Sequence, residues 1–500
     1  MQKFDVIIVG SGLGGMICGY ILSKEGYNVC ILEKNHQLGG CLQTFERNKC
    51  IFDTGMHYVG SLDEGQILNK FFKYFDLNGK LKLRKMDVDS FDIIQIAGKE
   101  YKYAQGYDNF IETLRHDFPN EKEALIKYVD KLKEVRGSLD SFMTNGILHD
   151  ANNMKNFEYF NINTHQFLKS ITNNYELQNV LAGLNALYAG HPDTNPFYLH
   201  AVINNSLIES SWRFVDGGSQ LIDHLAASII AHGGTILKKC EVKKFVSDSS
   251  GEIKYVELEN KEQLEAKKFI SNIHPVKTLD ITDSKLIRPA YRNRIKSIEN
   301  TTSVFSLYIV LKENFFKYFN YNYYYYKNPN VWSLQTYRQD TWPDGYMLYT
   351  PAHSKSEEYA DCLTAITYLK YDELKQWENT TVENRGQDYI DFKQQKAERF
   401  IDEIENKFPD IRSHIKTYYT STPLTYRDYT GSVNGSIYGI LKDSNDPLKS
   451  FIIPRTRIPN LFLTGQNINL HGVLGVSIGS VQTCSEFLGL NYILDKIKKA

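Results

Sequence analysis

Phe4-Asp5-Val6-Ile7-Ile8-Val9-Gly10-Ser11-Gly12-Leu13-Gly14-Gly15 is the stretch that decides the fold. Its first residues are mostly apolar and β-branched and predict a buried strand, and the glycines then predict a tight turn into a helix that runs to about Glu25. Gly10, Gly12 and Gly15 fill the G-x-G-x-x-G pattern of dinucleotide-binding units. Gly10 allows the turn, Gly12 lets a pyrophosphate approach the backbone, and Gly15 allows the helix to pack closely on the sheet.

An acidic residue follows at the spacing that this pattern requires. A second apolar strand, Asn28-Val29-Cys30-Ile31-Leu32, ends on Glu33, which stands 23 positions after Gly10. A carboxylate about 20 residues beyond the glycines accepts hydrogen bonds from ribose hydroxyls. Because it would repel a 2′-phosphate, the sequence disfavours NADP at this site. These features predict a Rossmann-type α/β domain that binds a dinucleotide.

Further motifs select FAD and indicate a family. Gly39-Gly40 adds a second glycine pair after the acid, and residues 51–60 read I-F-D-T-G-M-H-Y-V-G. Near the end of the chain, the apolar strand 460–464 leads into Gly465-Gln466, and Gly472-Val473-Leu474-Gly475 opens a helix. With these motifs the sequence resembles the FAD-dependent family of phytoene desaturases, carotenoid isomerases and retinol saturases. The phrase F-D-T-G-x-H-Y-x-G is most similar to the retinol saturase branch.

The resemblance implies the fold class and the domain organisation. We expect an α/β flavoprotein of the glutathione reductase-like and amine oxidase-like type, with a Rossmann-type FAD-binding domain and a discontinuous mixed α+β substrate domain. Residues 1–60, 212–275 and 451–500 should form the FAD-binding domain. Residues 61–211 should form a mostly helical part of the substrate domain, and residues 276–450 a sheet with helices.

The resemblance also implies the cofactor contacts. Val242 would contact the adenine through its backbone, and Gln466 stands where many relatives carry an acid. We expect FAD to be bound non-covalently, because no obvious flavin-linking cysteine stands beside the C-terminal glycines. The expected contacts are Gly10, Gly12, Leu13, Gly14, Gly15, Glu33, Lys34, Gly39, Gly40, Thr54, Gly55, Met56, His57, Val242, Gly465, Gln466, Leu474, Gly475 and Val476.

His57 is the best titratable candidate for a catalytic role, because the resemblance brings it beside the flavin and an ordinary histidine pKa near 6.5 suits proton exchange at neutral pH. A structural histidine is the alternative. Tyr58 and Tyr438 are weaker candidates that would shape the site. The tyrosine run 321–326 either walls an apolar cleft or forms an edge strand with exposed rings. Residues 137–163 are interpreted as an irregular connection, with a mobile lid as the alternative.

These features predict an FAD-dependent oxidoreductase or isomerase that acts on carbon–carbon double bonds of a lipophilic polyene or isoprenoid. Reduction, dehydrogenation and redox-neutral isomerisation all remain open. A single G-x-G-x-x-G leaves no second nucleotide domain, so any NAD(P)H would bind transiently or an external donor would supply electrons. A flavin amine oxidase is the alternative enzyme. A prenyl-binding escort protein without redox activity is the alternative of another class, and the intact glycines and Glu33 argue against it.

Composition excludes several other functions. A net charge of −1 on 500 residues leaves no footprint for nucleic acid. The seven cysteines form no C-x-x-C pair and no metal-type cluster, so we expect reduced thiols in a cytoplasmic protein and no metal. No run of 18 apolar residues could cross a membrane. Peripheral membrane contact and the oligomeric state stay open.

Overall fold

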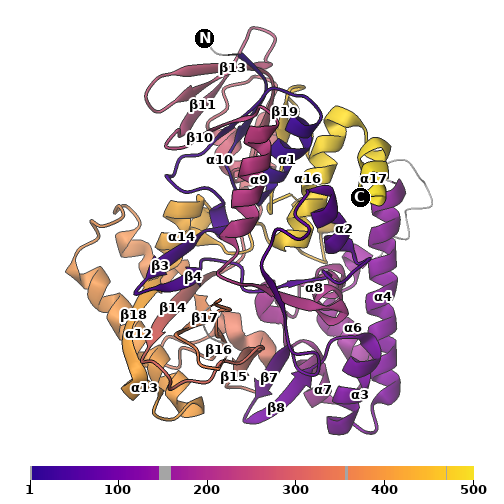
Figure 1. The fold of residues 1–500 in the computed structure, drawn as a ribbon, viewed down its shortest axis with the longest axis vertical. Helices are drawn as coiled ribbons and strands as arrows, with labels where there is room; N and C mark the ends of the chain where they lie inside the picture. Colours follow the sequence, from indigo (N-terminus) through magenta and orange to yellow (C-terminus); the bar gives the residue numbers. More distant parts are fainter. Residues whose placement is uncertain (1–2, 146–158, 355–357, 469) are drawn as a thin grey trace.

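A computed structural model describes residues 3–145, 159–354, 358–468 and 470–500 of the chain. The first sheet lies at the top of Figure 1, with the N-terminal strand at its centre. Its parallel part pairs β10, β2, β1, β13 and β19, whereas β12 and β11 pair antiparallel on the far side of β13. The bounds are β1 (Lys3–Val9), β2 (Val29–Leu32), β10 (Thr235–Leu237), β11 (Val242–Ser247), β12 (Ile253–Leu258), β13 (Gln263–Ser271) and β19 (Leu461–Leu463).

The registers align four parallel strand ends at one edge of the first sheet. Val9 lies opposite Leu32 of β2 and Ser271 of β13. Ser271 in turn lies opposite Leu463 of β19. In an open α/β sheet, ligands bind at the carboxyl ends of parallel strands. The residues that directly follow the four strands meet there: Gly10, Glu33, Asn272 and Thr464.

Alternating side chains of β1 give the first sheet a core on each face. Val6 and Ile8 are fully buried against helices on one side, and Ile7 is fully buried on the other. The first face carries α1 (Leu13–Lys24), α2 (Ile67–Tyr74), α9 (Ser219–Ala231), α16 (Gly472–Leu488) and α17 (Leu490–Lys499). The second face carries α10 (Pro275–Asp280) and α11 (Pro289–Lys296).

Helix α2 extends the core of the first sheet past the domain boundary predicted at residue 60. Phe71 and Phe72 of α2 are buried in the same core as Val6 and Ile8 of β1. Their rings cover apolar surface that the predicted domain would have left exposed. The division of the chain into two domains otherwise stays a prediction.

The second sheet lies at the lower left of Figure 1 and is built mainly from residues 303–421. Its order is β18, β14, β17, β16, β15, β7, β8, so the hairpin of residues 92–103 completes it at one edge. The bounds are β7 (Asp92–Ile96), β8 (Lys99–Tyr103), β14 (Ser303–Leu311), β15 (Asn322–Tyr326), β16 (Gly345–Tyr349), β17 (Cys362–Leu369) and β18 (Ile415–Ser421).

The tyrosine-rich strand is interior, which corrects the edge-strand interpretation. β15 pairs antiparallel with β16 and parallel with β7. Tyr323, Tyr324 and Tyr326 are buried, and Tyr325 is half-buried. The error has a physical reason, because four tyrosines in a row carry no apolar–polar alternation from which the exposure of a strand could be judged.

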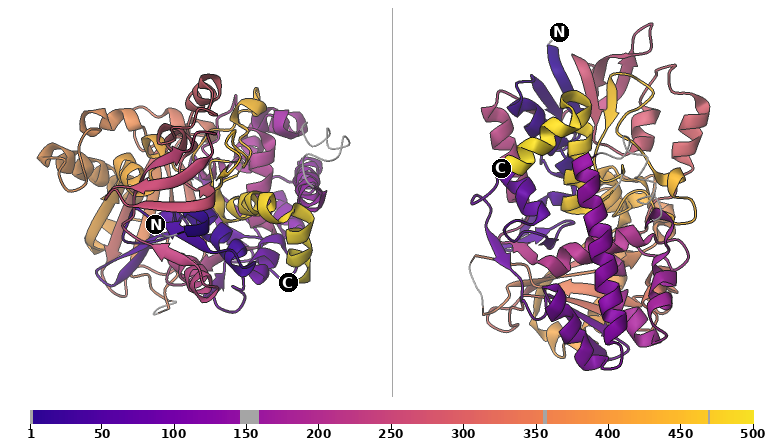
Figure 2. Two further views of the ribbon diagram at one scale, coloured as in Figure 1. Left: turned by 90° about the horizontal axis from the view of Figure 1, so that it is seen from above. Right: turned by 90° about the vertical axis from the view of Figure 1, so that its right-hand side faces the viewer.

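The helical insert packs at the lower right of Figure 1, and α4 runs along the molecule to reach α17 in the side view of Figure 2. The helix α4 continues to Asn145, so the first part of the predicted irregular connection 137–163 is helical. Residues 146–158 of that connection lie outside the described residues. The bounds are α3 (Tyr107–Asp117), α4 (Lys122–Asn145), α6 (Thr164–Ile171), α7 (Tyr175–Leu181) and α8 (Phe197–Glu209).

The remaining elements lie outside the two large sheets. The remaining strands are β3 (Thr44–Arg47), β4 (Cys50–Asp53), β5 (Val59–Gly60), β6 (Leu83–Lys85) and β9 (Ser211–Phe214). The remaining helices are η1 (Gly40–Leu42), η3 (Asn185–Leu187), η4 (Val331–Thr336), η5 (Tyr371–Trp377), α12 (Gln387–Lys407), α13 (Ile411–His414), α14 (Pro423–Thr430), η6 (Val433–Gly435) and α15 (Pro447–Ser450). Within the described part of the chain, no helix is long and apolar enough to cross a bilayer.

Candidate active site

The turn between β1 and α1 forms a cradle that has room only for backbone. A Cβ added at Gly12 would lie 3.0 Å from Asn272 Nδ2, and one added at Gly15 would overlap the carbonyl oxygen of Gly10. Gly12 caps α1 without a side-chain hydrogen bond. The N–H groups of the first turn and the positive end of the helix dipole are therefore available to an anion. This geometry fits the pyrophosphate of a dinucleotide.

Glu33 lies at the next strand end with its carboxylate already oriented. The side chain is 6% exposed, and its Oε2 accepts hydrogen bonds from the Ser11 hydroxyl at 2.6 Å and the Ser11 N–H at 3.0 Å. Its Oε1 accepts from the N–H of Asn35 at 2.9 Å. A carboxylate has about four acceptor positions, so capacity remains for the hydroxyls of a ribose.

Asn272 holds the cradle from the neighbouring strand, and sequence analysis missed it. Its Nδ2 donates to the carbonyl oxygens of Gly10 at 3.3 Å and Gly12 at 3.2 Å. A Cβ added at Gly14 would lie 2.6 Å from Asn272 Oδ1 and 2.8 Å from the Cα of Gly465. The only sequence signal is that an asparagine directly follows a predicted strand. This signal is informative only when that strand is known to pair with β1.

The second glycine pair lies against the first. Gly39 has φ 110° and donates its N–H to the carbonyl oxygen of Ser11 at 3.2 Å. A Cβ added at Gly40 would lie 3.3 Å from the Cα of Gly12. Gly465, with φ 95°, approaches from β19. The predicted contacts Gly39, Gly40 and Gly465 therefore surround the cradle, as a bound dinucleotide would require.

Two further predicted contacts, Val242 and Lys34, lie close to Glu33. Val242 opens β11, and just before it the N–H of Cys240 donates to the Glu33 carbonyl oxygen at 2.8 Å. This places the backbone at Val242 near the ribose acid. The side chain of Lys34 is committed elsewhere, because its Nζ donates to the carbonyl oxygen of Asp428 at 2.6 Å.

Residues 54–57 run along the far side of the glycine pair. The N–H and the hydroxyl of Thr54 donate to the carbonyl oxygen of Gln43 at 3.1 and 2.9 Å. A Cβ added at Gly55 would lie 2.9 Å from the carbonyl oxygen of Cys41. Met56 is buried in the core of the first sheet. These contacts fix the backbone that presents His57.

His57 lies against two tyrosine rings, and burial keeps its imidazole neutral. Its ring centroid is 4.6 Å from that of Tyr58 and 5.2 Å from that of Tyr349. Burial, followed by the positive charge of Arg213, lowers the pKa of His57 to about 3. This corrects the expectation that its pKa lies near 6.5, so the His57 ring is uncharged at neutral pH. Its Nε2 is buried and has no hydrogen-bond partner in the described chain.

A buried polar network lies behind His57 and was not foreseen from sequence. The Tyr58 hydroxyl donates to Asp92 Oδ2 at 3.0 Å, and Asn322 Nδ2 donates to Asp92 Oδ1 at 2.8 Å. Asn322 Oδ1 accepts from Arg213 Nη2 at 2.9 Å. Asn322 thus bridges a buried guanidinium and a buried carboxyl. Burial raises the pKa of Asp92, whereas the bonds from Asn322 and Tyr58 oppose that rise.

Arg213 is the anchor of that network and connects it to the second sheet. It is 1% exposed and donates to the carbonyl oxygens of Thr350 at 2.7 Å and Tyr321 at 2.6 Å. Its guanidinium carbon lies 5.9 Å from the ring centroid of Tyr349, the tyrosine that stacks on His57. The Tyr58 hydroxyl is therefore part of a buried network that holds the residues around His57 in place.

Tyr438 lines a small cavity at the start of α16. The cavity, of about 10 Å³, also borders Lys442, Gln466 and His471 and can hold about one water. Burial lowers the pKa of Lys442 to about 7 and that of His471 to about 4. Lys442 Nζ donates to the carbonyl oxygen of Ile468 at 3.2 Å. Lys442 and His471 are further site residues that sequence reasoning missed.

The start of α16 completes the predicted contacts. His471 caps this helix without a side-chain hydrogen bond to it, and Leu474, Gly475 and Val476 follow in its first residues. A Cβ added at Gly475 would lie 2.5 Å from Leu470 Cβ. The helix dipole favours negative charge beside these residues.

The turn at residues 183–187 accepts hydrogen bonds from two tyrosines of residues 276–450 and from His471 at the start of α16. Tyr326 donates its hydroxyl to the carbonyl oxygen of Gly183 at 2.6 Å. The hydroxyl of Tyr438 donates to Ala186 at 2.8 Å, and His471 Nε2 donates to the carbonyl oxygen of Leu187 at 2.9 Å. Because a carbonyl only accepts, Nε2 of His471 carries the proton.

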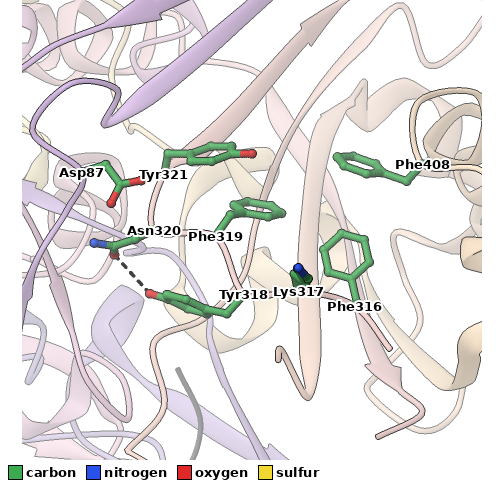
Figure 3. A pocket seen from close by; sticks show the side chains of 8 residues that line it. All are labelled: Asp87, Phe316, Lys317, Tyr318, Phe319, Asn320, Tyr321 and Phe408. Carbon is green, nitrogen blue, oxygen red and sulfur yellow. Dashed lines mark hydrogen bonds between the residues drawn. The ribbon is translucent and has the colours of Figure 1, made fainter. Parts of the chain in front are cut away.

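A wider hollow opens on the outside of the second sheet (Figure 3). It measures about 580 Å³ and is lined by Asp87, Phe316, Lys317, Tyr318, Phe319, Asn320, Tyr321 and Phe408. The Tyr318 hydroxyl donates to Asn320 Oδ1 at 3.1 Å across one rim. None of the predicted site residues lines this hollow. Arg213, which binds the carbonyl oxygens of Phe319 and Tyr321, separates it from His57.

Comparison with known proteins supports the cofactor fold and a family resemblance. A family model described as an NAD(P)-binding Rossmann-like domain matches residues 8–75. All-trans-retinol 13,14-reductase of Danio rerio is 25% identical, and the match covers 100% of this chain and 88% of that protein. Prolycopene isomerase of Daucus carota is 21% identical, covering 96% of this chain and 79% of that protein. The predicted resemblance to retinol saturases and carotenoid isomerases is confirmed along the full chain.

Solved structures confirm the fold class. A fatty acid isomerase from P. acnes, described as CLA-producing, superposes with a TM-score of 0.61 at 15% identity, covering 97% of this chain and 98% of that one. A putrescine oxidase bound to putrescine gives a TM-score of 0.63 at 13% identity and full coverage of both chains. At these identities the likeness establishes the architecture alone, which is that of the predicted α/β flavoprotein.

Proposed function

We propose that this chain is an FAD-dependent enzyme that acts on carbon–carbon double bonds of a lipophilic polyene or isoprenoid. The observation that carries the proposal is full-length similarity to both a retinol reductase and a prolycopene isomerase, in a chain whose dinucleotide cradle is intact. Both relatives are named for a conjugated, lipophilic substrate. The reaction is reduction, dehydrogenation or isomerisation.

The residues at the carboxyl edge of the first sheet fit FAD. The cradle at residues 10–15 would hold the pyrophosphate, Glu33 the ribose, and the backbone at Val242 the adenine. Residues 54–57 and the start of α16 would border the ring system. Bound FAD supplies hydride exchange with carbon, which no side chain of the protein can perform.

The side chains that would border the flavin ring orient the substrate and stabilise negative charge. His57 is neutral at physiological pH, so it acts through a hydrogen bond at its Nε2, which has no partner among the described residues, and not as a charged acid. The positive end of the α16 dipole stabilises negative charge that develops beside Leu474 and Gly475. The hydroxyls of Tyr58 and Tyr438 are committed to Asp92 and Ala186, so these residues shape the site without exchanging protons.

The deciding experiment begins with the absorption spectrum of the purified protein. A flavin spectrum that is lost on heat precipitation, with the yellow colour in the supernatant, supports non-covalent FAD. Colourless protein that reconstitutes no FAD would remove the basis of the proposal and favour a non-redox lipid-binding protein.

Substrate class and direction follow from a second experiment on the flavin-loaded protein. Polyenes and amines are each incubated anaerobically with the reduced and the oxidised protein. The masses of the products are then measured by mass spectrometry. A gain of two hydrogen atoms indicates reduction, a loss indicates dehydrogenation, and an unchanged mass with a new retention time indicates isomerisation. Turnover of amines alone would identify an amine oxidase and contradict the proposal. Adding NADH or NADPH to the oxidised protein tests whether either one serves as the transient reductant.

A further inference from the structure

Lys442 brings a positive charge to the small cavity at the start of α16. Among the described residues that line this cavity it is the only lysine or arginine, and none is an aspartate or glutamate. Its Nζ donates to the carbonyl oxygens of Ser450 at 3.1 Å and Ile468 at 3.2 Å. Since an ammonium has three donors, one of them has no partner in the described part of the chain.

No acid of the described chain pairs with this ammonium. Asp443, the next residue, accepts hydrogen bonds from the N–H and the Nδ2 of Asn445. Burial is the only cause that lowers the pKa of Lys442 to about 7, with no carboxylate opposing the fall. A charge that is removed from water is normally paired with an opposite charge. The missing counter-charge therefore points to an anionic ligand.

Other polar groups around the cavity are already committed to the protein. The hydroxyl of Tyr438 and the Nε2 of His471 donate to the turn at residues 183–187. The Tyr188 hydroxyl lies 2.8 Å from Nδ1 of His200. These groups have little capacity left for a ligand, whereas the ammonium has a donor to offer.

An apolar cluster joins the cavity to the start of α16. Tyr188 and Leu199 line the cavity and pack in one buried cluster with Leu470. Leu474, which would border the flavin ring, is half-buried and packs against the same cluster. Apolar contacts are therefore available between the cation and the expected edge of the flavin.

The cavity admits only the end of a ligand. Its volume of about 10 Å³ holds about one water, so one oxygen atom of a larger molecule can take the place of that water. A carboxylate oxygen accepts a charge-assisted hydrogen bond from an ammonium, which is roughly twice as strong as a bond between neutral groups. A hydroxyl or an ester oxygen at the same place would gain less.

We propose that Lys442 binds the carboxylate of a lipophilic polyene or isoprenoid acid and thereby selects acids over the corresponding alcohols and esters. The apolar chain of the ligand lies along the cluster of Tyr188, Leu199 and Leu474. The inference rests on the proposed function, because it names the end group of the same substrate. Apolar walls with a few polar groups that fix orientation are typical of small-molecule sites.

The test measures binding of a fluorescent polyene acid to the FAD-loaded protein under anaerobic conditions. Parinaric acid, a straight-chain acid with conjugated double bonds, is compared with its methyl ester, and the change in its fluorescence reports binding. We expect the acid to bind at least about tenfold more tightly than the ester at about pH 6.

The preference for the acid should decline as the pH rises above about 7, because the ammonium of Lys442 loses its proton there. The ester, which has no charge to pair, should show no such decline. The other titratable groups on the segments packed around Lys442 are Tyr188, His191, Asp193, His200, Glu299, Tyr438, Asp443, Asp446, Lys449 and His471. None of them contributes to the lowered pKa of Lys442.

Lys442→Gln should weaken binding of the acid about tenfold or more and leave binding of the ester unchanged. An amide can still donate to the carbonyl oxygens of Ser450 and Ile468, so we expect the variant to fold. Lys449→Gln is the matched control, because it removes the same charge from an exposed position that does not line the cavity, and both affinities should stay unchanged. Flavin content and melting temperature show whether each variant is folded. If Lys442→Gln does not fold, the pH dependence of the wild type decides.

Several outcomes overturn the proposal. Equal affinities of the acid and the ester at about pH 6, or a preference that Lys442→Gln retains, contradict a carboxylate site at Lys442. A lower midpoint potential of the flavin in Lys442→Gln, with the preference unchanged, would assign the charge to the reduced flavin. A preference that persists undiminished to about pH 9 would place a different cation at the carboxylate. Binding of the acid without turnover of any polyene would leave the carboxylate site intact and refute only the proposed function.

Discussion

The two sheets contribute to the candidate site by opposite means. The first sheet offers an edge where side chains are missing, since Gly12 leaves its backbone open to a pyrophosphate and Gly14 and Gly15 allow close packing against Gly465 and Gly10. The second sheet and its neighbours offer buried polar side chains that bind one another, with Arg213 and Asp92 joined through Asn322.

Because of this difference, a substitution in the first sheet should affect ligand binding, and one in the second sheet should affect stability. A side chain added at Gly12 is enough to fill the cradle, and the fold around it should survive. Removing a side chain from the Arg213 network instead leaves buried polar groups without partners, which costs stability before it affects chemistry. The predictions below separate these two kinds of failure.

Arg213→Met should give the largest loss of stability. The substitution removes the donors that satisfy Thr350, Tyr321 and Asn322 and leaves Asp92 without its cation, so the free energy of unfolding should fall by about 3–5 kcal/mol. Chemical denaturation measures it. Asp92→Asn should cost less, and the double variant should cost less than the sum of the two. A loss below about 1 kcal/mol for Arg213→Met would show that the network is not a stabilising unit.

Gly12→Val should empty the cradle without unfolding the protein. Its branched side chain would fill the space beside Asn272 that the pyrophosphate needs, and we expect FAD affinity to fall at least about 100-fold. The ratio of flavin to protein absorbance measures this loss. Gly137→Val is the control, because a Cβ at this exposed position in α4 meets nothing within 4 Å. Full flavin content in Gly12→Val would contradict the assignment of the phosphate site.

His57→Gln tests whether His57 serves the substrate or the fold. Turnover per bound FAD should fall about 10²-fold, the usual scale for loss of one preorganised hydrogen bond, while flavin content stays unchanged. Because the pKa of His57 is lowered to about 3, the pH profile of the wild type should show no His57 ionisation between about pH 5 and 8. Unaltered turnover per bound FAD would contradict a catalytic role of His57. A change in wild-type turnover near pH 6.5 that is absent from the variant would instead support proton exchange by His57.

His200 provides a test of burial that is confined to one side chain and grows with each pH unit. Its ring nitrogens lie 2.8 Å from the Tyr188 hydroxyl and 2.9 Å from the Tyr128 hydroxyl, and burial lowers its pKa to about 3. The unfolded chain binds this proton at about pH 6.5, so stability should fall as the pH drops from there towards about 3, by about 1.4 kcal/mol per pH unit. Urea unfolding at several pH values should show a shallower slope for His200→Gln. An identical slope would contradict the neutral buried histidine.

The nucleotide half of the site could be predicted because its determinants are local. A glycine turn needs particular dihedral angles at neighbouring residues, and Glu33 follows a strand at a fixed spacing from Gly10. Asn272 was not predicted as a site residue, because its role depends on β13 lying next to β1. That pairing joins residues more than 250 positions apart.

The sequence by itself determined the dinucleotide cradle, the α/β class and the family resemblance, because short motifs and strand periodicity specify them within a few residues. Only the tertiary structure decided the chemical state of His57, whose pKa depends on the depth of its burial and on Arg213, 156 positions away in the chain. It also decided that the tyrosine strand is interior and that Asp92, Arg213 and Asn322 meet. The burial and the electrostatic environment of a side chain depend on every segment that packs around it, so no local sequence pattern specifies them.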